Sequence, residues 1–121
     1  MKLLQLNAWG GRLEPQVRDL LTMEEPDIAC LQEVISFEQA EGAGLFISLE
    51  SIQRECHLPF VGFAPVFSFN YMKGIARFGN AVLSRQPIHK TEAIFTYLEH
   101  KENFMWGEDN GNVRNFVHAI V

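Results

Sequence analysis

Asp27–Val34, DIACLQEV, is the stretch of this chain that decides its fold. Its apolar run, Ile28–Leu31, predicts a short buried strand. The strand ends on a polar pair, Gln32 and Glu33. Because ligands of open α/β sheets collect outside the carboxyl ends of the strands, we expect a carboxylate at this point to face a site. Glu33 is therefore the leading candidate for a catalytic metal ligand.

A second apolar strand opens the chain and ends in the same way. In Leu4–Gly11, LQLNAWGG, the strand residues lead to Asn7, which an aromatic residue and two glycines follow. A right-handed β-α-β crossover would lay this strand beside Ile28–Leu31, with Asn7 and Glu33 at the same edge of the sheet. One amide oxygen and one carboxylate can form half of a site for a hard cation.

The rest of the chain mixes helix and strand patterns. Apolar residues recur at helical spacing in residues 13–25 and 45–56, which predicts two helices. Four later segments have the pattern of strands: 60–69, 79–84, 91–98 and 114–121. Pro65 indicates an edge position or a bulge in the first of them, whose phenylalanines are expected to fill a core. The chain is predicted to be an α/β protein with a mixed sheet and flanking helices.

Charge argues against a strong electrostatic grip on nucleic acid. The chain has 10 basic and 15 acidic residues, a net charge of −5 and a pI near 5.3. A bound divalent cation would reverse the sign of the local charge, so the acidic balance does not exclude a phosphate substrate. The balance favours a small or locally recognised phosphoester over a long duplex.

Bulk features predict a cytoplasmic location. No apolar leader follows Met1, and no apolar run is long enough to span a bilayer. Cys30 and Cys56 form no metal-binding spacing and are expected to be reduced thiols rather than a disulfide.

Three motifs in this order resemble the first half of the endonuclease/exonuclease/phosphatase superfamily: LNAWGG, PDIACLQEV and GNAVLSRQPI. That superfamily includes the DNase I-like nucleases, abasic-site endonucleases, sphingomyelinases and inositol-phosphate phosphatases. The resemblance runs from Leu4 to Val121. It implies a four-layer α/β/β/α sandwich about twice as long as this chain. Residues 1–121 would then be a truncated, N-terminal portion of a single domain.

The same resemblance implies a metal-dependent phosphoester hydrolase: a phosphodiesterase, nuclease or phosphatase. Glu33 matches the family's metal-binding glutamate, and Asn7 matches the asparagine at the end of its first strand. The implied cofactor is Mg²⁺, with Mn²⁺ as the alternative. The implied substrate is a nucleic acid, a phospholipid or a sugar phosphate.

Two further residues are candidate substrate contacts. Arg114 matches a position where many family members carry a basic residue, and its guanidinium fork suits phosphate, although a strand-entry arginine is as easily structural. By resemblance Asn80 lines the floor of the pocket, and the competing interpretation is that it caps a turn after Gly79. The polar segment 99–112 is expected either to pack over the substrate or to lie against the sheet edge.

Most of the family's catalytic residues are absent from this sequence. It contains neither a G-D-x-N motif nor an Asp-His pair, and none of its four histidines has that context. Two hypotheses follow. The first is a hydrolase domain that is active only when completed. The second is a non-catalytic fragment that oligomerises or pairs with another chain through an exposed sheet face and the open edge of its last strand.

Overall fold

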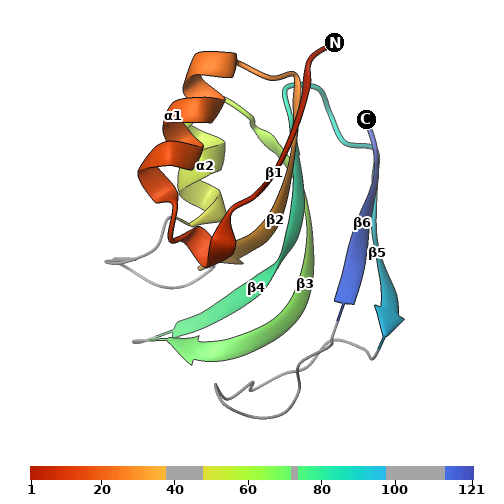
Figure 1. The fold of residues 1–121 in the computed structure, drawn as a ribbon. Coiled ribbons are helices and arrows are strands. Elements are labelled where there is room, and N and C mark those ends of the chain that lie inside the picture. Colours follow the sequence, from red (N-terminus) through yellow and green to blue (C-terminus); the bar gives the residue numbers. More distant parts are fainter. Residues whose placement is uncertain (38–47, 72–73, 98–113) are drawn as a thin grey trace.

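A computed structural model describes residues 1–37, 48–71, 74–97 and 114–121 and shows three layers (Figure 1). Two helices cover one face of a four-stranded sheet, and a two-stranded sheet lies on the other face. In chain order the elements are β1 (Leu3–Asn7), the 3₁₀ turn η1 (Trp9–Gly11), α1 (Glu14–Glu24), β2 (Ile28–Ser36), α2 (Leu49–Glu55), β3 (Phe60–Tyr71), β4 (Gly74–Ser84), β5 (Lys90–Tyr97) and β6 (Arg114–Ile120). Within these ranges, none of the helices could cross a membrane.

The larger sheet is mixed, as predicted. Its strand order is β1-β2-β4-β3, with β1 and β2 parallel and the other pairs antiparallel. Asn7 is the register partner of Gln32, and the Ala8 N–H extends the pairing by donating to the Gln32 carbonyl oxygen at 2.8 Å. The pairing of β1 with β2 therefore ends at Asn7 and Gln32, and Glu33 follows. The prediction that the second strand ends on Gln32 and Glu33 is wrong, because β2 continues past the bulge to Ser36.

The main core lies between this sheet and the helices. Alternate residues of the strands point to the same face of a sheet, and on the helix side these residues are apolar. Leu21 of α1, Ile52 of α2 and Leu31 of β2 are almost completely buried there. Both predicted helices are confirmed within the described residues. Arg18 joins them by donating to Glu55 at 2.9 Å, which holds the pKa of that carboxyl below its usual range.

Aromatic side chains form a second core at the far ends of β3 and β4. Phe67 and Phe78 stack with ring centroids 4.8 Å apart, and Phe69 is buried beside them. Three of the four phenylalanines in 60–69 pack in or against a core, as predicted, whereas Phe60 is exposed. The strand predicted at 79–84 is longer in the structure, because β4 starts at Gly74. The aromatic packing against β3 extends the antiparallel pairing back to that residue.

Three bulges interrupt the described strand pairs. In β2, two residues lie opposite Asn80 between the pairs Leu31–Ala81 and Val34–Gly79. In β3, Val66 is the extra residue, and in β5 it is Thr96. β3 is an edge strand of its sheet, so the prediction from Pro65 is confirmed.

Two glycines allow the strands and sheets to approach closely. A Cβ atom on Gly62 would lie 2.6 Å from the Oγ1 atom of Thr91, where β5 crosses β3. A Cβ atom on Gly79 would lie 2.2 Å from the carbonyl oxygen of Ala64 and 2.8 Å from the Cα atom of Pro65. The obstacle is a side chain in the first case and backbone in the second.

This difference predicts that a second mutation, Thr91→Ala, restores stability in one glycine variant and not in the other. Gly62→Ala and Gly79→Ala should each lower the free energy of unfolding, by about 1–3 kcal/mol or more, because both overpack a closed contact. Thr91→Ala should restore much of the loss in Gly62→Ala and none in Gly79→Ala. Urea unfolding of the single and double variants measures this coupling. Equal rescue of both glycine variants would contradict the assigned obstacles.

Candidate functional site

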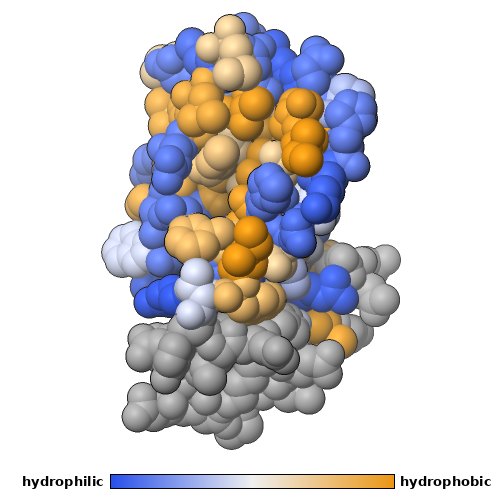
Figure 2. Space-filling view, turned by 90° about the vertical axis from the view of Figure 1, so that its right-hand side faces the viewer, coloured by the Kyte–Doolittle hydropathy of each residue, from blue (hydrophilic) through white to orange (hydrophobic). Residues whose placement is uncertain are grey.

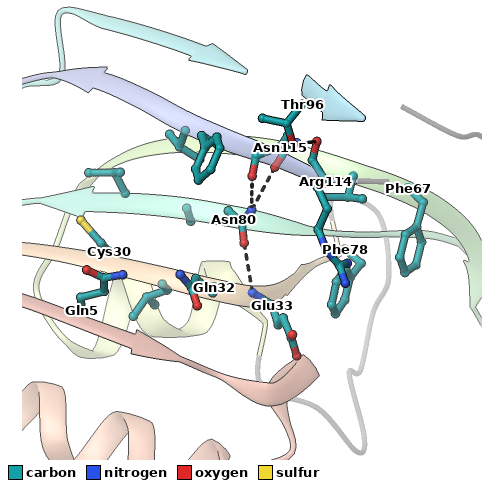
Figure 3. A pocket seen from close by; sticks show the side chains of 16 residues that line it. Gln5, Cys30, Gln32, Glu33, Phe67, Phe78, Asn80, Thr96, Arg114 and Asn115 are labelled. Atoms are coloured by element: carbon teal, nitrogen blue, oxygen red, sulfur yellow. Dashed lines mark hydrogen bonds between the residues drawn. The ribbon is translucent and has the colours of Figure 1, made fainter. Parts of the chain in front are cut away.

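A cavity of about 610 Å³ lies between the two sheets (Figure 3). Gln5, Cys30 and Gln32 line it from β1 and β2, Asn80 from β4, and Asn115 from β6. All three bulges open onto it, since their residues are among those that line its wall. Bulges re-aim side chains, and they are common beside active sites. Burial raises the pKa of the Cys30 thiol, which favours its protonated form over a nucleophilic thiolate.

Glu33 occupies the bulge of β2 in a left-handed backbone conformation, with φ of 56°. Non-glycine residues seldom adopt this conformation, which costs of order 1–2 kcal/mol. Its backbone N–H donates to the Oδ1 atom of Asn80 at 3.3 Å. The bulge turns the half-buried Glu33 side chain to the rim of the cavity, and Figure 3 shows its carboxylate pointing away from Asn80.

Asn80 and Asn115 continue this hydrogen bond across to the second sheet. The Nδ2 atom of Asn80 donates to both the backbone oxygen and the Oδ1 atom of Asn115, each at 3.0 Å. Asn115 in turn donates to the carbonyl oxygens of Ala64 and Pro65, at 3.1 and 3.0 Å. These bonds connect β2, β4, β6 and β3.

Asn7 lies at the end of β1, beside this rim. Its Oδ1 atom accepts a hydrogen bond from the Trp9 N–H at 2.7 Å. This bond fixes the turn into η1, where Trp9 and Gly10 have positive φ. Gly10 packs against the ring of Phe78, since a Cβ atom added to Gly10 would lie 3.7 Å from that ring. Phe78 in turn lines the cavity. The Asn7 turn is thereby placed at the same end of the cavity as Phe78.

Arg114 begins β6 at the opposite wall. Its side chain is exposed and lines the cavity. Figure 3 shows it extending from β6 toward Phe78, on the side where Glu33 lies. No carboxylate of the described ranges forms an ion pair with it. Its guanidinium fork has the geometry to bind an anion that enters at this end.

The donors at this rim fit part of a magnesium or manganese site. Glu33 offers a carboxylate, and the amide oxygen of Asn7 keeps one lone pair beyond the Trp9 bond. Hard cations prefer such oxygen ligands but take about six of them. In the described part of the chain, no group of three or more His, Cys, Asp or Glu side chains could hold a metal. The two residues could hold a cation only together with further ligands.

The structure brings three of the predicted site residues, Glu33, Asn80 and Arg114, to one cavity and places Asn7 beside it. The segment 99–112 lies outside the described residues. Sequence reasoning did not identify Asn115, which is only 5% exposed. A polar residue at an inward position of the last strand was the available signal.

The backbone of Glu33 predicts an unusual order of stabilities. Glu33→Gly should be more stable than Glu33→Ala by about 1 kcal/mol, because glycine adopts positive φ without a Cβ clash. Gln32 is the matched control, since its φ is not positive. There the alanine variant should be the more stable one. Urea unfolding of the four variants measures both differences, and the same order at both positions would contradict a left-handed Glu33.

The sequence and the fold of the chain were compared with protein families and with solved structures, and both comparisons found similar proteins. The model of the Endonuclease/Exonuclease/phosphatase family matches residues 4–120. No curated protein sequence gives a significant match.

Two solved structures are similar to the chain. One is an endonuclease/exonuclease/phosphatase from Beutenbergia cavernae DSM 12333, with 16% identity and a TM-score of 0.62 over 80% of this chain. The other is an endonuclease/exonuclease/phosphatase family protein from Leptotrichia buccalis C-1013-b, with 16% identity and a TM-score of 0.56 over 98% of this chain. The chain spans 29% of the first protein and 48% of the second. At these identities, the likeness shows the fold.

Proposed function

The chain belongs to the endonuclease/exonuclease/phosphatase family, and from this membership we propose that it supplies the Glu33 and Asn7 part of a metal-dependent phosphoester hydrolase site. One observation carries the proposal. The β2 bulge places the Glu33 carboxylate at the rim of a cavity, at the same end of the parallel strand pair as Asn7.

Each residue of the site has a chemical role in this proposal. Glu33 and Asn7 would hold Mg²⁺ or Mn²⁺, which when bound polarises a phosphoryl oxygen and stabilises charge that develops on it. The fork of Arg114 would bind phosphate oxygens from the opposite wall and orient the ester. Asn80 would line the floor beneath the substrate. The local positive charge would offset the chain's net charge of −5.

The remaining ligands and the general base would come from residues beyond this sequence. The similar structures are at least twice as long as the chain, and the sequence lacks a G-D-x-N motif and an Asp-His pair. The substrate class is a phosphoester of a nucleic acid, a phospholipid or a sugar. A cytoplasmic location suits the two free thiols, Cys30 and Cys56.

Metal binding at Glu33 is testable with the chain itself. Mn²⁺ titrated into ¹⁵N-labelled protein should broaden amide signals near Glu33 and Asn7 first, because the paramagnetic effect is local. Glu33→Gln should weaken this broadening on the order of 10-fold, since it removes the charge from a hard-cation ligand.

Asp19→Asn is the matched control, because Asp19 is an exposed carboxylate on α1. It should leave the broadening at Glu33 unchanged. A pattern in Glu33→Gln identical to that of the unmodified chain would show that Glu33 is not the ligand.

Pairing with a second copy of the chain is the competing function, and the apolar surface favours it. Apolar side chains gather on the side of the molecule that carries β5 and β6 (Figure 2). Phe116 is 64% exposed there, and Ile94 and Ile120 are about half exposed. Exposed apolar patches often mark interaction surfaces.

Sedimentation velocity together with an activity assay separates the two functions. Under the pairing hypothesis the chain should dimerise as its concentration rises. Phe116→Asp should abolish this dimer, while Met23→Asp, a change at a 74% exposed residue of α1, should not. A chain that remains monomeric would exclude the pairing hypothesis. Mg²⁺-dependent hydrolysis of bis(p-nitrophenyl) phosphate by the product of the full coding sequence, lost in Glu33→Gln, would support the hydrolase.

A further inference from the structure

We propose that Asn80 and Asn115 form an amide clamp that positions the Glu33 carboxylate by fixing its backbone. The inference rests on the proposed role of Glu33 as a metal ligand. It makes Asn80 and Asn115 positioning residues, which act through Glu33.

The clamp acts where the bulge of β2 interrupts the strand ladder. Regular pairing stops at Leu31 and resumes at Val34, so Glu33 has no register partner in β4. The Oδ1 atom of Asn80 accepts a hydrogen bond from the Glu33 N–H at 3.3 Å. A left-handed glutamate is strained and persists only where its surroundings hold it. This hydrogen bond acts on the residue that needs the support.

Asn115 determines which end of the Asn80 side chain faces Glu33. Both N–H groups of the Asn80 amide are used, because Nδ2 donates to the O and Oδ1 atoms of Asn115 at 3.0 Å. A flipped Asn80 amide would point its donors at the Glu33 N–H and its oxygen at two acceptors. The flip would therefore lose all three bonds. Only one orientation is satisfied, and it presents an acceptor to Glu33.

The other end of the clamp is anchored at the bulge of β3. Asn115 donates to the carbonyl oxygens of Ala64 and Pro65, which lie just before the extra residue Val66. Asn115 is 5% exposed, so its amide makes these bonds away from solvent, where hydrogen bonds are costly to lose. The clamp thus spans two bulges and both sheets. A displacement of β6 would be transmitted to the backbone of Glu33.

A positioning role and a merely stabilising role predict different responses. Asn80→Asp keeps an oxygen that can accept from the Glu33 N–H but loses the donors to Asn115. Asn80→Ala loses both. If the clamp positions Glu33, the Glu33 amide should stay protected from exchange in Asn80→Asp, which keeps the acceptor, and lose protection in Asn80→Ala. If the clamp only adds stability, protection of the Glu33 amide should change in proportion to the global free energy of unfolding in all variants.

The experiment measures amide hydrogen exchange and Mn²⁺ broadening by NMR in the 121-residue chain. Exchange at Glu33 is compared with exchange at Ala29, a buried residue of the same strand that reports global opening. The variants are Asn80→Ala, Asn80→Asp and Asn115→Ala. Asn70→Ala is the matched control, since it truncates an exposed asparagine of β3.

Asn80→Ala should speed exchange at Glu33 relative to Ala29 on the order of 10-fold, the equivalent of one hydrogen bond. It should weaken Mn²⁺ broadening at Glu33 by a similar factor. Asn115→Ala should have a smaller effect of the same kind, Asn80→Asp should keep the slow exchange, and Asn70→Ala should change neither measurement.

Glu33 exchange and broadening in Asn80→Ala that match the unmodified chain would overturn the clamp. So would equal loss of protection in Asn80→Asp and Asn80→Ala. If Asn80→Ala does not fold, the contrast between Asn80→Asp and Asn115→Ala decides the question in the same way. An unmodified chain with no Mn²⁺ broadening at Glu33 would instead refute the proposed function, while the exchange comparison still tests the clamp.

Discussion

Buried polar groups of the backbone must find hydrogen-bond partners, and this requirement shapes the space between the two sheets. Each bulge interrupts a strand ladder and leaves such groups without their regular partners. Asn80 and Asn115 supply partners to the bulges of β2 and β3. Thr96 makes a similar contact with the carbonyl oxygen of Arg114 at the bulge of β5. The position of the small sheet and the aim of Glu33 both depend on these side-chain bonds.

The larger sheet has two chemically different faces. Toward the helices it presents small and branched apolar residues such as Ala29, Leu31 and Leu83, which belong to the main core. Toward the second sheet the same strands present amides, including Gln32 and Asn80. The first face contributes stability through burial. The second face orients the side chains and the backbone of the site, because hydrogen bonds fix orientation as well as distance.

The sequence was most informative where a pattern is local. Hydrophobic spacing predicted both helices, and the apolar run before Glu33 predicted the part of β2 that pairs with β1. The continuation of β2 to Ser36 was missed, because it follows a bulge. Pro65 marked the edge strand and its bulge because proline cannot donate to a ladder. The start of β4 was missed because it depends on aromatic packing against β3. Asn115 was missed because its partners, Ala64 and Pro65, lie about fifty residues earlier in the chain.

The close approach at Gly79 has an evolutionary consequence. A side chain at that position would collide with the backbone of β3, so the absence of a Cβ atom and the bulge after Pro65 require each other. A lineage that lost the bulge would release the constraint on the glycine, and one that replaced the glycine would have to move β3. Position 79 and positions 64–66 should therefore co-vary among homologous sequences. Their joint substitution would mark the branches in which the pairing of β3 with β4 was rebuilt.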